Sequence, residues 1–335
     1  MKKFIYYIGI DVSKLKLDVT VLWESAQDTK TSYHVIANEM KSIAQFIKEL
    51  SKGRKTEDMV FCFEDTGVYS LLLAYYFSNK GLCYSQVPSI EIKRSKGISR
   101  GKSDKTDSSD IAFYAYTHLH KLSFSVIPVV AVQKLKLLFA EREKVLKALA
   151  VFERTNENIG FIPAEIYSCV SSINKSVVSK LKNALSQIEE KMLEIIKRDD
   201  KIKEQYKLVT SIPGIGRQTA IYLIIATKSF DAFDNWRKLA CYAGTAPFPY
   251  QSGTSIKGRT KVHPMADKKL KSLLNMCAMV AVRYDKELKI YYERKIKEGK
   301  SKMLVLNNVR CKLLARVFAV INRQTPFVDI CKFVA

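Results

Sequence analysis

Few features of this sequence are typical of disulfide-bonded, zinc-binding or membrane proteins. Its seven cysteines are scattered and never form a C-x-x-C pair, so we expect neither a disulfide framework nor a zinc ribbon. His118 and His120 have no cysteine or carboxylate cluster nearby that would complete a zinc site. The apolar run at the start is interrupted by Asp11, Lys14 and Lys16, so we expect no spanning segment or cleavable signal. These absences predict a cytoplasmic protein with reduced thiols.

Acidic residues are also scarce. Among 335 residues there are 33 acidic and 56 basic side chains, which gives a formal net charge of +23. Such an excess suits a polyanionic partner, and nucleic acid is the leading candidate. A basic surface that merely keeps the protein in solution is the alternative. The hydrophobic content of 47% is high enough for folded cores, so general disorder is not expected.

The first 120 residues alternate between strand and helix patterns. The predicted order is three strands, helix, strand, helix, strand. It fits an α/β domain in which a hairpin joins parallel crossovers. The expected strands are Phe4–Ile10, Leu17–Trp23, Ser32–Ala37, Met59–Phe63 and Leu82–Val87, and the expected helices run from an N-cap at Asn38 to Lys52 and from Val68 to Asn79. Residues 88–103 are predicted to be irregular, with a helix beginning near Asp104.

After Pro128 the pattern changes to long helices. Val132–Glu153 is apolar on one face, and a second helix carries apolar residues at three- and four-residue steps from Val178 to Ile202, interrupted only by Asp199. These two segments predict an antiparallel helical coiled-coil spacer. Helices are also expected in the last third, around a loop at 239–264 that is rich in glycine, serine and proline. We therefore predict three domains: residues 1–125, 126–206 and 207–335.

Asp11 and Glu64 each end an apolar strand. If these strands are parallel neighbours, both carboxylates lie at the carboxyl edge of the sheet, where α/β proteins form their sites. Asp104 and Asp107 are three residues apart and share one face of a helical turn. Crowded carboxylates repel one another, and oxygen ligands of this kind favour Mg²⁺ or Mn²⁺. Two such ions, about 3.5–4 Å apart, could stabilise attack and departure at a phosphodiester.

Each acid also has a plain structural interpretation. Asp11 could cap the turn at Val12–Lys14, and the segment Glu64–Gly67 could simply start a helix. Asp104, Asp107 and Asp110 could form a solvated first turn that the helix dipole favours. The order of the acids and their places at strand ends favour the metal site over these separate explanations.

The strings GIDVSKLKLDV, EDTGVY and KSDKTDSSDIA resemble the N-terminal domain of the IS-one-ten, or Piv-like, family of insertion-sequence transposases, the DEDD recombinases. The resemblance implies an α/β RuvC-like (RNase H-like) fold. It also implies that Asp11, Glu64, Asp104 and Asp107 are catalytic metal ligands. Asp107 and Asp110 offer the same spacing, but Ile111 and Ala112 favour the first pair because the family's helix continues there.

The resemblance extends through the C-terminal half, which it implies to be a mainly α transposase domain. The segment SIPGIG resembles a helix–hairpin–helix turn, whose glycines let backbone N–H groups approach a phosphate, although ordinary helix–helix turns also use proline and glycine. The segment AGTAPFPYQSGTS is similar to the family's second signature and implies that Ser252 is a nucleophile. Ser255 is the alternative, and an ordinary loop serine is the other. The candidate nucleic-acid-binding residues are Gly214, Gly216, Arg217, Lys257, Arg259, Lys261, Lys268 and Lys269, with a solvated basic face as the alternative for each lysine or arginine.

The resemblance implies an enzyme that transposes or recombines DNA through a covalent 5′-phosphoserine intermediate, with Mg²⁺ or Mn²⁺ as cofactor. The implied partners are donor and target DNA and a structured non-coding guide, the bridge RNA. A homo-oligomer, dimer or tetramer, would build a composite active site from two subunits. No membrane partner is expected.

Three other functions remain open from the residues. A RuvC-like junction-resolving nuclease would not need Ser252. A non-catalytic nucleic-acid-binding protein would not need the complete set of acids. An actin-like ATPase would also suit GIDVSKLKLDV as a phosphate-binding turn, but its second Asp-Gly loop and adenosine motif are missing from the sequence.

Overall fold

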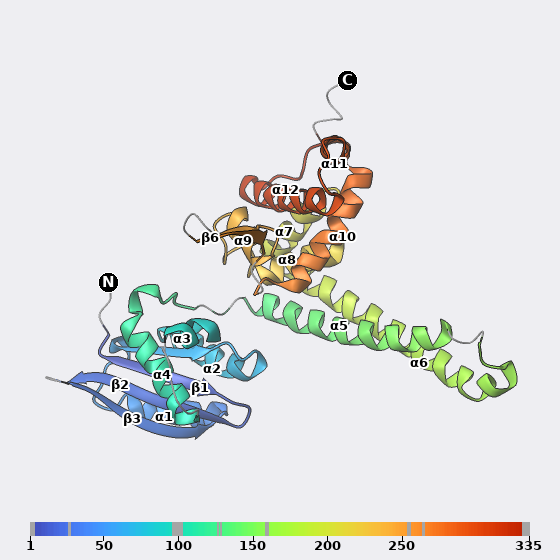
Figure 1. Cartoon of the computed structure of the whole chain (residues 1–335). Coiled ribbons are helices and arrows are strands. Elements are labelled where there is room, and N and C mark those ends of the chain that lie inside the picture. The colour runs from blue at the N-terminus through green and yellow to red at the C-terminus, as the bar shows by residue number, and fades with distance from the viewer. Residues whose placement is uncertain are drawn as a thin grey trace. The chain divides into compact units, whose positions relative to one another are not determined.

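Apolar segments of the N-terminal half form one mixed sheet (Figure 1). Its strands are β1 (Tyr6–Val12), β2 (Lys16–Ser25), β3 (Asp28–Ala37), β4 (Met59–Glu64) and β5 (Tyr84–Val87), in the order β3-β2-β1-β4-β5. The first three strands are antiparallel neighbours, whereas β4 is parallel to β1 and β5 is parallel to β4. The predicted order of three strands, helix, strand, helix, strand is confirmed.

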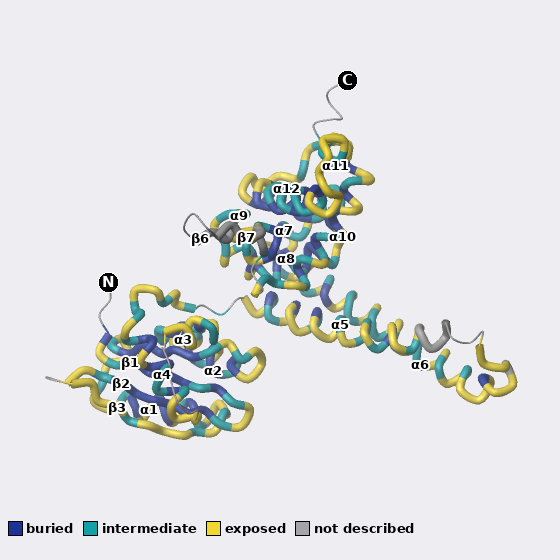
Figure 2. The backbone as a smooth tube through the Cα atoms, in the orientation of Figure 1, coloured by how far each residue is buried: buried dark blue, intermediate teal, exposed yellow. Residues whose placement is uncertain are grey.

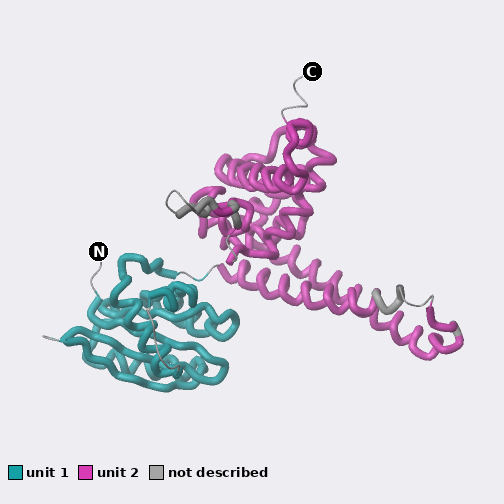
Figure 3. Tube along the Cα trace, viewed as in Figure 1, with its two compact units in different colours: residues 1–127 teal, residues 128–335 magenta. Residues whose placement is uncertain are grey.

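This computed structural model describes residues 4–25, 28–95, 103–125, 127, 129–157, 161–252, 256–262 and 265–329. The chain divides into two compact units, residues 1–127 and 128–335 (Figure 3). Each unit has its own apolar core, and each is described by itself below.

The two faces of the sheet are covered by different helices. On one face, Ile8 and Ile10 of β1 are buried with side chains of α1 (Met40–Leu50) and α2 (Val68–Asn79). On the other face, Tyr7 is buried with residues of α3 (Ser89–Ser95) and α4 (Asp104–Thr117). This alternation follows from the two-residue period of a strand. Figure 2 shows the buried strands between these more exposed helices. Short 3-10 helices cover Thr56–Asp58 and Leu119–Lys121.

Two local expectations in this unit are wrong. Helix α3 lies within residues 88–103, which were expected to be irregular. The residue that precedes the first turn of α1 is Glu39 rather than Asn38. The Asn38 amide instead donates to the carbonyl oxygens of Ser13 and Tyr69, at 2.9 and 3.0 Å. Asn38 therefore ties the β1–β2 turn to the start of α2.

The second unit begins with a long antiparallel pair, α5 (Val130–Glu157) and α6 (Ala164–Arg198) (Figure 1). Ion pairs join the two helices at Arg142–Glu189, 2.7 Å, and at Glu153–Lys182, 3.2 Å. Asp199 does more than interrupt the apolar seam: it ends α6, and its side chain accepts from the N–H of Ile202 and so caps the next helix. A coiled-coil geometry for α5 and α6 stays a prediction.

The rest of this unit is mainly helical. Its elements are α7 (Asp200–Thr210), α8 (Arg217–Ala226), α9 (Trp236–Tyr242), the antiparallel hairpin β6 (Phe248–Ser252) and β7 (Ile256–Lys261), α10 (Lys268–Tyr284), α11 (Lys286–Lys297) and α12 (Lys302–Arg323). Leu208, Leu223, Leu274 and Leu313 are fully buried in the core that these helices share. The hairpin lies where the sequence predicted only a loop. Within the described residues, no helix combines the length and apolar character needed to span a bilayer.

Candidate active site

Asp11 and Glu64 occupy neighbouring positions on adjacent parallel strands, at the carboxyl edge of the sheet. Ile10 and Phe63 are paired residues of the parallel strands β1 and β4, and the two acids are the next residue on each strand. The expectation that these strands are parallel neighbours is confirmed. Both acids lie on the α4 face, because Asp11 alternates with Gly9 and Glu64 with Cys62 along their strands.

Gly9 brings helix α4 close to the two strand-end acids. A Cβ atom on Gly9 would lie 2.2 Å from the backbone nitrogen of Ala112 and 2.3 Å from the carbonyl oxygen of Ser108. The hydroxyl of Ser108 also forms a buried hydrogen bond with the hydroxyl of Thr20 on β2, with 2.8 Å between the two oxygens. Only glycine therefore permits α4 to lie this near to β1.

The first turn of α4 carries Asp104 and Asp107. Ser103 caps the helix: its side chain accepts from the N–H of Thr106, and the Thr106 hydroxyl accepts from the N–H of Ser103. This capping box fixes where the helix begins, and thereby which residues occupy the turn next to β1. Asp104 is exposed and Asp107 is half-buried.

Electrostatics show that these carboxylates belong together. The pKa of Asp11 is raised, first by its burial and then by the negative charges of Asp107, Asp104, Glu64 and Asp18. Three other elements of the first unit, β2, β4 and α4, thus place acids near Asp11. A nearby cation would stabilise such a concentration of negative charge, which stands out in a chain with a net charge of +23.

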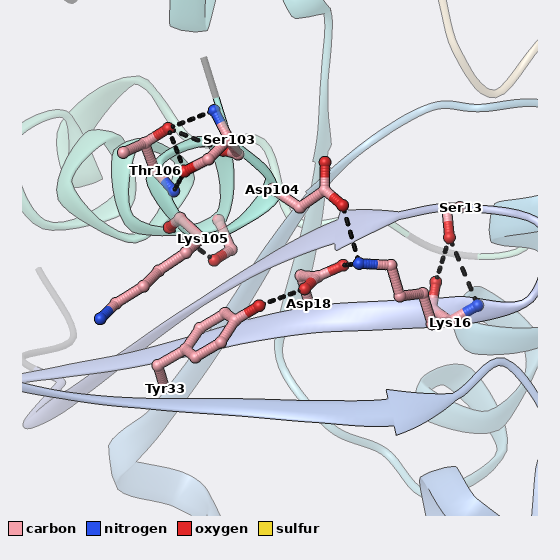
Figure 4. Close-up of polar contacts among 9 residues, drawn as sticks. Ser13, Lys16, Asp18, Tyr33, Ser103, Asp104, Lys105 and Thr106 are labelled. Atoms are coloured by element: carbon pink, nitrogen blue, oxygen red, sulfur yellow. Dashed lines mark hydrogen bonds and ion pairs between the residues drawn. The ribbon is translucent and has the colours of Figure 1, made fainter. Parts of the chain in front are cut away.

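Asp18 is the acid that sequence reasoning missed. It is the register partner of Asp11 on β2, and only 1% of it is exposed. The Tyr33 hydroxyl donates to it, and the Lys16 ammonium lies 3.0 Å from one of its oxygens (Figure 4). The same ammonium donates to Asp104 at 2.7 Å, so Lys16 joins the two acids. The signal was present, because Asp18 is an acid inside a strand whose neighbours are apolar.

The simple capping interpretations apply to other residues. The β1–β2 turn is closed by Ser13, whose hydroxyl donates to the Lys16 carbonyl oxygen at 2.8 Å. In the turn before α2, it is Asp65 that accepts from the N–H of Gly67. Glu64 instead accepts from the hydroxyl of Ser89, the first residue of α3. Asp11 and Glu64 are therefore not needed as caps.

The donor set is all oxygen and suits a hard divalent cation such as Mg²⁺ or Mn²⁺. Among the described residues, no three acid, histidine or cysteine side chains already lie close enough to ligate one ion together. Metal binding would therefore require the carboxylates to turn toward one another. Lys16 forms ion pairs with two of the acids in this cluster, Asp18 and Asp104.

The residues of the second signature lie on the β6–β7 hairpin. Ser252 is the last residue of β6 and is the register partner of Ile256. Ser255 lies outside the described residues. Lys257, Arg259 and Lys261 are on β7. Only the backbone of these strand residues is described, so the role of each side chain remains a prediction.

The glycine-rich turn between α7 and α8 has a packing function. Gly214 has a φ of +92°, and a Cβ atom there would lie 2.7 Å from the Ala281 Cβ on α10. Gly216 is the N-cap of α8 and has open space around it, and the exposed Arg217 follows. Close packing alone thus explains Gly214, whereas Gly216 and Arg217 remain accessible.

Two candidate lysines begin α10, and they differ in their surroundings. Lys269 forms an ion pair with Glu143 of α5 and lies over the ring of Phe139. Lys268 is exposed. Lys269 therefore holds α10 against α5, and Lys268 is the better placed of the two for phosphate contact.

Comparison with known proteins identifies the family. A family model described as a DEDD transposase of IS110 type matches residues 8–158, and the model of the transposase IS116/IS110/IS902 family matches residues 206–293. The two matches include every candidate acid and the β6–β7 hairpin. The chain belongs to the IS110/IS116 family of transposases.

Several relatives of this transposase are known by name. The pilin gene-inverting protein of Moraxella bovis is 28% identical over 330 residues, which cover 96% of this chain and 97% of that protein. An uncharacterized 43.6 kDa protein of insertion element IS110 from Streptomyces coelicolor is 28% identical over 44% of this chain and 37% of its own length. A 42 kDa protein of IS900 from Mycobacterium paratuberculosis is 33% identical over 32% of this chain and 28% of its own.

Membership of this family implies an enzyme of DNA transposition or recombination. The mixed five-stranded sheet and the mostly helical second half agree with the fold that the sequence predicted.

Proposed function

We propose that this transposase cuts and rejoins DNA through a covalent serine–phosphate link, with a divalent cation at the acidic site. One observation carries the proposal: Asp11, Glu64, Asp104 and Asp107 gather at one edge of the sheet in a strongly basic protein. DNA supplies the phosphate, and the negative charge of its backbone is opposite in sign to the net charge of +23 on the protein.

Asp11, Glu64, Asp104 and Asp107 would hold the Mg²⁺ or Mn²⁺. Such an ion, when bound, supplies positive charge to a phosphodiester under attack and to its leaving oxygen. The alternative pair Asp107 and Asp110 is less favoured, because Asp104 and Asp107 are the helix α4 charges that raise the pKa of Asp11. The protein's own contribution is to crowd the acids and to keep one of them, Asp11, half-buried.

Ser252 is the proposed nucleophile. Its hydroxyl oxygen bonds to the DNA phosphorus while the bond from phosphorus to the 3′ oxygen breaks, and the 3′ oxygen receives a proton. The 5′ phosphate is then held as a phosphoserine ester. Attack by the 3′ hydroxyl of another strand reverses the bonding, restores the serine hydroxyl and joins the strands without any other source of energy.

The partners in this proposal are donor and target DNA, a structured non-coding guide RNA, and further copies of the chain. The name of the Moraxella relative says that it inverts a pilin gene, and inversion requires that DNA be broken and rejoined. Ser252 and the acids lie in different compact units, so a dimer or tetramer could combine them from two subunits into one composite site. The proposed nucleic-acid contacts are Gly214, Gly216, Arg217, Lys257, Arg259, Lys261, Lys268 and Lys269.

The test uses the full chain with Mg²⁺, labelled donor and target DNA, and the non-coding RNA transcribed from the flanks of its gene. We expect a covalent protein–DNA adduct that requires Mg²⁺ and is lost in Ser252→Ala and in Asp11→Ala. An adduct that persists in Ser252→Ala contradicts the assigned nucleophile, and Ser255→Ala is then tested. If the same amount of adduct forms when the RNA is omitted, the proposal that an RNA guides the reaction is contradicted.

A further inference from the structure

A buried arginine lies beneath the segment that leads to β6. Arg310 of α12 is 4% exposed, and within the described part of the chain its side-chain hydrogen bonds go to two asparagines rather than to a carboxylate. A buried guanidinium is costly unless its charge is compensated, and burial accordingly lowers the pKa of Arg310. Its guanidinium donates to the side-chain oxygens of Asn275, at 2.6 Å, and Asn307, at 3.4 Å. The buried guanidinium is therefore bound by the oxygens of two neutral amides and not by a carboxylate.

Asn307 uses the other end of its amide on a different part of the fold. Its Nδ2 donates to the carbonyl oxygen of Thr245 at 2.6 Å. Thr245 is completely buried, and its own N–H donates to the carbonyl oxygen of Ala240 in α9 at 2.9 Å. Both backbone groups of Thr245 are therefore held. Thr245 lies three residues before Phe248, where β6 begins, and β6 ends at Ser252.

The turn just before Thr245 has little freedom. Gly244 has a φ of +65°, and a Cβ atom there would lie 2.6 Å from the Ala266 Cβ. The N–H of Gly244 donates to Cys241 at the end of α9. Two more bonds hold this segment to α9: the Thr245 hydroxyl and the N–H of Ala246 both donate to the carbonyl oxygen of Ala240, at 3.2 Å each. The bond from Asn307, at 2.6 Å, is the short one that holds the Thr245 carbonyl oxygen to α12, beside a longer contact from the Cys311 thiol at 3.5 Å.

We infer that Asn307 and Arg310 are positioning residues for β6, the strand that ends at Ser252. Arg310 orients the Asn307 amide, and this amide holds Thr245 in place. The position of Thr245 in turn sets the path of β6 toward Ser252. This role rests on the proposed function, in which Ser252 is the nucleophile. Arg310 requires an acceptor and the Thr245 carbonyl oxygen requires a donor. An asparagine side chain supplies both in one rigid plane.

A pair of isosteric substitutions separates this role from simple stabilisation. Asn307→Asp keeps the acceptor and gives Arg310 a carboxylate, but it removes the donor and turns an oxygen toward the Thr245 carbonyl. Asn275→Asp is the matched control, because it also gives Arg310 a carboxylate and leaves Thr245 untouched. A merely structural role predicts that the two variants behave alike.

We expect Asn275→Asp to form the adduct at the wild-type rate. Asn307→Asp should bind DNA with unchanged affinity, keep a melting temperature near that of Asn275→Asp, and form the adduct about 10- to 100-fold more slowly. Hydrogen exchange of the segment from Thr245 to Ser252, followed by mass spectrometry, should be faster in Asn307→Asp alone. This second readout does not depend on the chemistry.

The outcomes are distinct. The proposed function is contradicted if the wild-type protein forms no adduct, or if an adduct still forms in Ser252→Ala. In either case, hydrogen exchange of the segment from Thr245 to Ser252 still reports on the positioning contact. Equal adduct rates and equal exchange in the two variants overturn the inference. Loss of DNA binding and melting temperature in parallel with the adduct also overturns it. If Asn307→Asp fails to fold, Arg310→Met tests the same link, because it retains Asn307 but removes the group that orients it.

Discussion

Gly9→Ala tests whether the close approach of α4 to β1 builds the acidic site. The new methyl group would lie 2.2 and 2.3 Å from backbone atoms of Ala112 and Ser108, far inside the roughly 3.4 Å of an ordinary contact. Backbone cannot rotate away as a side chain can, so α4 must shift from the strand by about 1 Å. Overpacking of this kind costs about 1–3 kcal/mol, and we expect the upper end.

The shift would also move Asp104 and Asp107 away from Asp11. A displacement of about 1 Å at a catalytic group can reduce a rate about 100-fold. We therefore expect urea unfolding to show a loss of about 3 kcal/mol, and DNA cleavage by the remaining folded protein to fall about 100-fold. Gly216→Ala is the control for stability, because nothing lies within 4 Å of its added methyl group. A Gly9→Ala protein as stable and as active as wild type would refute the reasoning.

Three further predictions concern charged side chains. The raised pKa of Asp11 means that its ionised form opposes folding, so the contribution of this residue to stability is present at low pH and is lost as the pH rises through its folded-state pKa. In the presence of a chelator, Asp11→Asn should raise the urea midpoint at pH 7, and an unchanged midpoint would contradict this. Lys16→Met should tighten Mn²⁺ binding measured by calorimetry, since the ammonium competes for the carboxylates beside it, whereas Lys14→Met on the same turn should not. Lys269→Ala should lower the melting temperature, and Lys268→Ala should reduce the salt slope of DNA binding by about one; the reverse pattern would show that the two roles were exchanged.

Two of the site residues that could be predicted from the sequence are acids that follow directly on an apolar segment. Asp11 and Glu64 each end an apolar run, and parallel neighbours necessarily align such ends. Asp18 was missed because it lies inside a strand, where hydrophobic periodicity predicts burial but gives no reason for an acid. Its reason is tertiary: Lys16 and Tyr33 supply the partners that make burial tolerable.

The errors in the fold have the same origin. Asn38 is a good N-cap in isolation, but its amide finds two carbonyl partners that are distant in sequence. Asp199 looked like a defect in a long helix, yet a side chain that accepts a backbone N–H can end one helix and start the next. Local propensity contains no information about which of these bonds the rest of the chain makes available.

The most direct measurement of the central claim is the chemical identity of the protein–DNA link. The full chain is incubated with Mg²⁺, DNA and the flanking RNA, the DNA is digested, and the modified peptide is sequenced by mass spectrometry. The account predicts a nucleotide attached through its 5′ phosphate to Ser252. Attachment to another residue, or strand transfer without any covalent link to the protein, would contradict it.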